Sequence, residues 1–209
     1  MSRGRFITIE GGEGAGKSTL IRSLEQVLEA RGLDVVTTRE PGGTVLAEEI
    51  RNLVLHPPGE TQWSALAEAL LMNAARADHV EKKIAPALAA GKWVICDRFA
   101  DSTRVYQGIG GVNDTMLQAM QAEVTKDAAP DITFILDGPV DELLQRRTAR
   151  GTSDIFERRP IGFHTAVRER FLEIAKAAPD RCKVVDASRD PSRVLEDVLS
   201  VIDERVSAS

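Results

Sequence analysis

One short segment constrains the fold more than any other: G-G-E-G-A-G-K-S at residues 11–18, with the spacing G-x-x-x-x-G-K-[ST] of a phosphate-binding loop. Its glycines allow backbone N–H groups to turn inward around an anion, where a Cβ would obstruct them. Lys17 would place its charge near the phosphates, and the Ser18 hydroxyl could hold Mg²⁺. An apolar run precedes the segment and helical spacing follows it. This context disfavours the alternative, a glycine-rich turn that binds nothing.

Length and composition fit one α/β domain. The chain has 209 residues, of which 43% are hydrophobic, and a net charge of −5. Because non-specific binding to nucleic acid or membranes favours a basic surface, this balance argues against both. Cys96 and Cys182 form no C-x-x-C pair, so neither a disulfide framework nor a zinc site is indicated. No signal peptide or membrane-length apolar stretch is evident, which predicts a cytoplasmic protein.

Apolar runs alternate with helical periodicity along the chain. Strands are expected at Phe6–Glu10, Asp34–Thr38, Trp93–Asp97, Ile132–Asp137 and Lys183–Asp186. Helices are expected at Lys17–Arg31, Thr44–Leu55, Gln62–Ala90, Asp114–Ala128, Val140–Arg150, Phe163–Ala177 and Pro191–Val206, with a kink or early end at Pro86. This alternation predicts an α/β fold with a parallel five-stranded sheet and helices on both faces. Residues 1–209 would form one domain, with a mobile flap at about 146–162.

Charged residues follow the second and third predicted strands. Arg39 ends the second, and Asp97-Arg98 ends the third. Ligands of an open parallel sheet gather at this edge. Asp97 has the position of a residue that holds Mg²⁺ directly or through water. Each arginine alone could form a surface ion pair, but two of them at the ligand edge predict bidentate phosphate recognition.

Glu13 places a negative side chain inside a loop built to receive phosphates. That placement is electrostatically unfavourable unless the carboxylate points elsewhere. We therefore expect Glu13 to face the acceptor side and to accept a hydrogen bond from a sugar hydroxyl or a similar donor. The alternative is a solvent-facing glutamate at a variable position.

Three longer segments resemble bacterial thymidylate kinases: I-E-G-G-E-G-A-G-K-S-T at 9–19, T-R-E-P-G-G-T at 38–44, and D-R-F at 97–99 followed by Ser102 and V-Y-Q-G at 105–108. Many families share the first segment, whereas the other two are far more specific. The resemblance implies a three-layer P-loop NTPase-type fold. It also implies transfer of the ATP γ-phosphoryl group to dTMP, giving dTDP and ADP for dTTP synthesis, with Mg²⁺ as cofactor and a homodimer as the assembly.

The resemblance also implies a role for each matching position. Arg39 and Arg98 would clamp the acceptor phosphate, and Glu13 would meet the deoxyribose 3′-hydroxyl. Tyr106 would crowd the sugar 2′ position, while Arg76 would contact the thymine edge. The remaining implied residues are Met72, Ser102 and Gln107 in the base pocket; Gly11, Gly12, Glu13, Gly14, Ala15, Gly16, Lys17, Ser18 and Thr19 around the ATP phosphates; Asp186 and Ala187 beside adenine; Ser18 and Asp97 on the metal; and a cis peptide at Pro41.

The flap matches the group of relatives that lacks an arginine in the phosphate loop. Gly14-Ala15 stands where other relatives carry it, and Arg146 and Arg150 match the basic flap positions of this group, joining Lys17, Arg39 and Arg98 as catalytic candidates. Alternatively, any one flap arginine is a solvated helix end. The chain departs from the family twice: Met72 replaces the usual aromatic residue, and 154–157 reads D-I-F-E instead of Asp-Arg-x-Glu. Arg147, Arg158 and Arg159 have no assigned role.

Two other functions fit parts of the pattern. The first is a kinase for a deoxynucleoside or a different nucleotide; a nucleoside kinase needs a carboxylate base, for which Glu10 is the obvious local candidate. The second is a nucleotide-driven switch, but Thr125-Lys126-Asp127 lacks the N-K-x-D spacing. A monoester acceptor is already anionic and needs no general base, which agrees with the arginine-rich edge.

Overall fold

Five parallel strands form one sheet in the computed structural model, which describes residues 3–59, 61–148 and 159–207. The strands are β1 (Phe6–Gly11), β2 (Val35–Arg39), β3 (Trp93–Asp97), β4 (Ile132–Asp137) and β5 (Cys182–Asp186). Their order is β2-β3-β1-β4-β5. Because the order reverses at β1, a ligand crevice opens at the carboxyl end of that strand.

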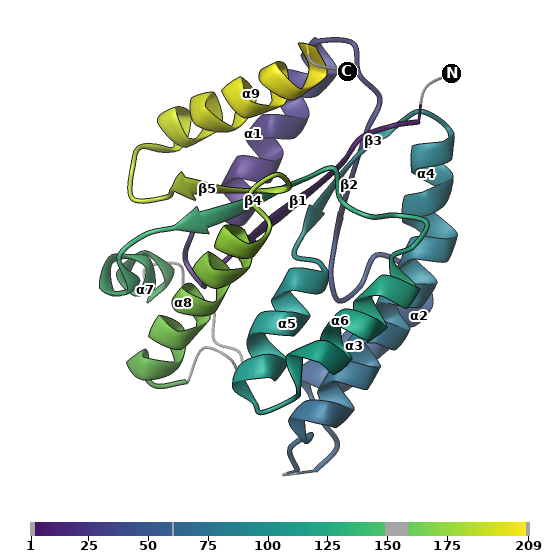
Figure 1. Cartoon of the computed structure of the whole chain (residues 1–209), viewed down its shortest axis with the longest axis vertical. Coiled ribbons are helices and arrows are strands. Elements are labelled where there is room, and N and C mark those ends of the chain that lie inside the picture. Colours follow the sequence, from purple (N-terminus) through teal and green to yellow (C-terminus); the bar gives the residue numbers. More distant parts are fainter. Residues whose placement is uncertain (1–2, 60, 149–158, 208–209) are drawn as a thin grey trace.

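Helices cover both faces of this sheet. They are α1 (Lys17–Ala30), α2 (Val45–Leu55), α3 (Ala65–His79), the π-helix η1 (Val80–Ile84), α4 (Ala85–Ala89), α5 (Ala100–Ile109), α6 (Asp114–Val124), α7 (Val140–Thr148), α8 (Ile161–Ala177) and α9 (Pro191–Ser207). Helices α1 and α9 lie together over one face, and α4, α5 and α8 over the other (Figure 1). The predicted three-layer α/β fold is confirmed.

The central strand β1 is buried along its whole length. Ile7 and Ile9 pack into the cluster formed with α1 and α9, while Phe6 belongs to the cluster on the opposite face. A strand covered on both faces is expected to be almost continuously apolar. Thr8 and Glu10 are the polar exceptions, and both are fully buried. Glu10 therefore requires internal hydrogen-bond partners, which the site provides.

The helix predicted over Gln62–Ala90 begins later than expected and does not end early at Pro86. Its N-cap is Ser64, whose hydroxyl accepts the Ala67 N–H at 3.2 Å. A π turn, η1, precedes Pro86 and places it in the first turn of α4. Because α3, η1 and α4 follow one another without a break, Pro86 lies inside a continuous helical segment. The π turn shifts the hydrogen-bond register there, with the Ala85 N–H donating to the Val80 carbonyl, and the chain stays helical although Pro86 has no N–H to donate.

The sequence pattern predicts no helix over residues 100–109, and this prediction is wrong because α5 lies there. Its buried residues include Asp101, Thr103 and Gln107 beside Val105, so the apolar periodicity is weak. Their partners come from distant segments of the chain. No local rule could have indicated that this polar face is internal.

Two other predictions concern helix ends and the flap. The helix expected to reach Ala128 ends at Val124. Most of the predicted flap, including Arg150 and Arg158, lies outside the described residues. Within the described ranges, no helix is both long and apolar enough to cross a membrane.

Candidate functional site

The loop between β1 and α1 has the backbone geometry of an anion cradle. Gly14 and Gly16 have φ angles of 75° and 88°, in the left-handed region that glycine enters without a Cβ penalty. The Lys17 ammonium donates to the carbonyl oxygens of Gly11 and Gly12 at 3.2 and 2.9 Å. Burial lowers the pKa of Lys17. The helix N-terminus and this ammonium therefore bring positive potential to one loop.

Two cavities meet at this loop. One, the arginine cavity, has a volume of about 400 Å³ and is lined by all eight residues expected on the acceptor side. The other, the α9 cavity, has a volume of about 440 Å³ and reaches from Thr19 to Ala187 and the start of α9. Gly14, Ala15 and Gly16 line both. A ligand in each cavity would have its end at the same glycine loop.

Arg98 occupies an unusual backbone conformation at the wall of the arginine cavity. Its φ of 65° is left-handed, which costs a non-glycine residue about 1 kcal/mol. One guanidinium nitrogen, Nη1, donates to the Gly11 carbonyl at 3.1 Å and to the Ser102 hydroxyl at 3.2 Å. The guanidinium carbon lies 5.2 Å from the centre of the Tyr106 ring. Strain of this kind persists only where surrounding contacts hold it.

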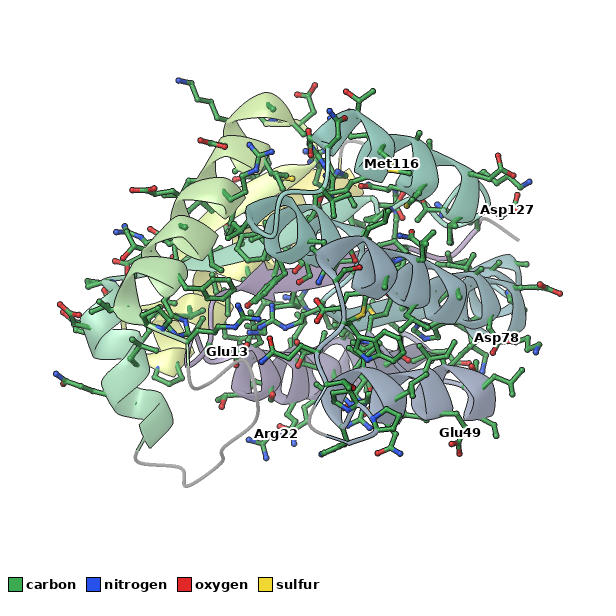
Figure 2. All side chains as sticks on the ribbon, turned by 90° about the horizontal axis from the view of Figure 1, so that it is seen from below. Glu13, Arg22, Glu49, Asp78, Met116 and Asp127 are labelled. Carbon is green, nitrogen blue, oxygen red and sulfur yellow. The ribbon has the colours of Figure 1, made fainter. Side chains whose placement is uncertain are left out.

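Glu13 pairs with Arg98 instead of facing the phosphate cradle. Its Oε1 accepts from Arg98 Nη2 at 2.5 Å, and the carboxylate lines the arginine cavity. Glu13 is labelled to the left of the centre in the view from below (Figure 2). The guanidinium therefore offsets the negative charge that a phosphate loop would otherwise disfavour. Contact with a sugar hydroxyl stays a prediction.

Two side chains line the arginine cavity, together with the phosphate loop, and carry oxygen atoms that could bind a metal. The Ser18 hydroxyl at the start of α1 and the Asp97 carboxylate at the end of β3 are 3.5 Å apart. A hydroxyl and a carboxylate are hard ligands suited to Mg²⁺, which keeps several waters and usually binds few protein groups. These two residues fit the predicted metal position.

Arg39 and Arg51 border the outer part of the arginine cavity. Arg39 is largely exposed and donates to Glu48 Oε2 at 3.0 Å, the surface pair that the sequence left open. The sequence interpretation did not include Arg51, which donates to the Pro41 carbonyl at 2.9 Å. The Glu40–Pro41 peptide is cis, which is the isomer that the resemblance implied at this position. The sequence feature that could have indicated Arg51 is its position two turns into the helix that follows this loop.

The inner end of the arginine cavity is formed by a buried ion-pair network. Arg76 is 3% exposed, and its Nε donates to Glu40 Oε2 at 2.7 Å. Nη1 and Nη2 donate to Asn73 and Thr103 at 3.2 and 2.9 Å. The other Glu40 oxygen lies 3.1 Å from His79 Nδ1. Three of the five N–H donors of Arg76 are thus engaged by these partners, and its contact with a base stays a prediction.

The remaining base-pocket candidates also line this inner end. Gln107 is 3% exposed and donates to Glu68 at 3.1 Å, which orients its amide. Burial raises the pKa of Tyr106 to about 12, so its phenol is neutral at physiological pH. Met72 borders the same space. Leu55 and Phe99 also line it, and the sequence interpretation included neither.

The α9 cavity holds the candidates for the donor side. Arg146 on α7 lines it and donates to the carbonyl oxygens of Ala187 and Ser188 at 2.6 and 2.8 Å. The Asp186 carboxylate turns away to accept the Ser188 N–H at 2.9 Å. Arg146 therefore lies at the strand end of this cavity, and its catalytic role stays a prediction together with that of Arg150.

Glu10 is engaged at the start of α5. One oxygen accepts the Phe99 N–H at 2.8 Å, and the other accepts the Ser102 hydroxyl at 2.6 Å. Burial raises the pKa of Glu10 to about 7. These contacts disfavour the alternative in which Glu10 acts as a general base on a nucleoside hydroxyl, because both of its oxygens already accept hydrogen bonds from α5 and the residue before that helix.

Comparison with known proteins gives consistent matches over the chain. The model of the family described as thymidylate kinase matches residues 9–198. The thymidylate kinase of Caulobacter vibrioides is 47% identical over 207 residues, which cover 99% of each chain. That of Nitrobacter winogradskyi is 51% identical, covering 97% of this chain and 90% of the relative. The crystal structure of thymidylate kinase from Ehrlichia chaffeensis superposes with a TM-score of 0.78 at 37% identity, covering 96% of this chain and 99% of that one.

Proposed function

The chain belongs to the thymidylate kinase family and phosphorylates dTMP to dTDP with ATP as donor, and we propose that it does so where the arginine cavity and the α9 cavity meet. The observation that carries this proposal is the loop segment Gly14-Ala15-Gly16, which lines both cavities. In the proposal, dTMP occupies the arginine cavity and ATP the α9 cavity. Their phosphates then approach end to end at the loop.

The chemical problem is electrostatic, because two phosphorylated anions must approach each other. Phosphoryl transfer through a loose transition state needs positioning and charge neutralisation more than a general base. Lys17 and the α1 N-terminus oppose charge on the donor phosphates, while Arg98 and Arg39 oppose charge on the acceptor. For Arg39 this requires leaving Glu48 on binding, which its exposed position permits.

Mg²⁺ is the proposed cofactor, held by Ser18 and Asp97. When bound, it neutralises charge on the donor phosphates. The side chains supply the rest of the proposed site: Glu13 for the 3′-hydroxyl, Tyr106 against a 2′-hydroxyl, and Arg76 at the base. Arg146 and Arg150 remain proposed flap contributors, and residues 1–209 are proposed to form a single domain.

An acceptor series tests this proposal. In a coupled assay of ADP release with dTMP, dUMP, dCMP, UMP and thymidine, we expect dTMP to be fastest. UMP should be poor because its 2′-hydroxyl meets Tyr106, and thymidine should be poor because it offers no phosphate to the arginines. Faster turnover of thymidine than of dTMP would show that the acceptor-phosphate assignment is wrong.

We also propose a homodimer, formed through α2, α3 and α6 on one side of the molecule (Figure 1). Each of these helices carries exposed apolar side chains: Leu46 on α2 is 56% exposed, Leu66 and Leu70 on α3 are 42% and 53% exposed, and Met116 on α6 is 45% exposed. Met116 lies at the rim of the molecule in Figure 2. The same shape and chemistry on a second copy would cover this surface by twofold pairing.

A cytoplasmic location is also part of the proposed function, and cell fractionation tests it.

Sedimentation equilibrium tests the dimer. Leu70→Glu is expected to give a monomer, because a charge at the centre of an apolar interface has no partner when buried. Val206→Glu is the matched control, since Val206 is 50% exposed at the far end of α9 and should leave the mass unchanged. A wild-type monomer at micromolar concentration would contradict the proposal.

A further inference from the structure

The turn that carries Arg98 is held from outside by several elements. The Arg98 N–H donates to the Ile9 carbonyl of β1 at 2.9 Å, and the Arg98 carbonyl accepts the Cys96 thiol at 3.0 Å. The next N–H, that of Phe99, donates to Glu10 Oε1 at 2.8 Å. These contacts fix both peptide groups beside a left-handed residue. Of the three, only the Glu10 contact uses a charged side chain.

Glu10 also reaches the guanidinium of Arg98 through one intermediate hydroxyl. An ionised carboxylate only accepts hydrogen bonds, so the Ser102 hydroxyl must donate its hydrogen to Glu10 Oε2 at 2.6 Å. The lone pairs of that hydroxyl then accept from the Arg98 Nη1 donor at 3.2 Å. The polarity of the chain from Arg98 through Ser102 to Glu10 is therefore set by the carboxylate.

We propose that Glu10 is a positioning residue for phosphoryl transfer, which holds the Arg98 guanidinium toward the acceptor phosphate through the Ser102 hydroxyl and the Phe99 N–H. This inference rests on the proposed function of Arg98. Glu10 itself touches neither substrate. Asp101 on α5, whose negative charge adds to burial in raising the pKa of Glu10, is paired with Arg181 by two hydrogen bonds at 2.6 and 3.1 Å.

An amide at position 10 would break this polarity while preserving the shape of the side chain. Its oxygen could still accept the Phe99 N–H, but its NH₂ group would face the Ser102 oxygen as a donor. The Ser102 oxygen would then accept from the amide, and its own hydrogen would lose the Glu10 oxygen as acceptor, so the orientation of its lone pairs toward Arg98 would no longer be fixed. Arg98 would lose an anchor, although β1 and the start of α5 would keep their backbone contacts.

Glu10→Gln therefore tests the inference through the two Michaelis constants. The assay is run at about pH 8, where a carboxyl group with a pKa of about 7 is mostly ionised. We expect KM for dTMP to rise at least about tenfold, because a hydrogen bond to a charged group is lost. KM for ATP should be unchanged. A merely structural role would lower the active fraction and leave both constants as they are. Thr8→Val is the control, a buried polar residue on the same strand and face.

Ser102→Ala keeps the inference testable if Glu10→Gln does not fold. It removes the link to Arg98 and leaves the Glu10 contact with Phe99 intact, so KM for dTMP should again rise. In the double variant, the effect should not exceed that of Glu10→Gln alone, because both act through one chain. Unchanged KM for dTMP in folded Glu10→Gln and Ser102→Ala overturns the inference. If Arg98→Ala also leaves KM for dTMP unchanged, the proposed function of Arg98 fails as well. If Arg98→Ala raises KM for dTMP, only the inference about Glu10 fails.

Discussion

Arg98→Ala is expected to lower kcat/KM for dTMP by about three orders of magnitude, the scale on which arginine stabilises a transferring phosphoryl group. Its guanidinium lies between Glu13 and Ser102 in the arginine cavity, next to the phosphate loop. A lysine at this position could not reproduce the bidentate hydrogen bonding of a guanidinium group to a phosphate. Steady-state kinetics with dTMP as the varied substrate measure the loss.

Arg104→Ala is the matched control for this prediction. Arg104 lies on the same helix, α5, and is bound to Asp114 at 3.1 and 2.9 Å, away from the arginine cavity. We expect it to leave kcat/KM near the wild-type value. Equal, small losses in both variants would mean that Arg98 contributes to the fold of α5 and not to the reaction.

Arg76→Met is expected to lower the free energy of unfolding by about 3–5 kcal/mol. The substitution leaves Glu40, which is 5% exposed, without its closest cationic partner at 2.7 Å. His79 remains beside the carboxylate, but its contact alone is longer at 3.1 Å. Denaturant unfolding measures this loss. A weak dTMP affinity in an Arg76 variant therefore cannot be assigned to lost base contacts without a stability measurement.

The double variant Arg76→Met, Glu40→Gln separates the two effects. A neutral amide at position 40 costs far less to bury than an unpaired carboxylate, so much of the lost stability should return. The dTMP affinity should stay low if Arg76 also contacts the base. A single Arg76→Met variant as stable as wild type would show that the buried pair is not a net stabiliser.

The parts of the site that the sequence predicted depend on short-range patterns. The phosphate loop combines its glycines with a preceding strand and a following helix, and the structure has β1 and α1 at those positions. The sequence also predicts that Arg39 and Asp97-Arg98 lie close together, because parallel strands share one carboxyl edge. Their presence in one cavity follows from that rule.

The parts that the sequence did not predict depend on pairing between distant residues. The ion pair of Glu13 with Arg98 joins positions 85 residues apart, and that of Glu40 with Arg76 joins positions 36 apart. Periodicity contains no information about such partners, so it does not predict α5. The sequence indicates Glu10 only as the carboxylate base that a nucleoside kinase would need, and it does not predict the contacts of Glu10 with Phe99 and Ser102. Arg51 on α2 also lines the cavity; its place two turns into the helix that follows the loop was a signal that the sequence interpretation did not use.

A crystal structure with dTMP, ADP and Mg²⁺ bound together tests the central claim most directly, namely that both nucleotides meet at residues 14–16. We expect the ADP β-phosphate on the backbone N–H groups of the loop and near Lys17. The dTMP phosphate should lie within hydrogen-bonding distance of Arg98, with Arg39 released from Glu48. A dTMP phosphate that contacts neither arginine, or an ADP that lies outside the α9 cavity, would contradict the account.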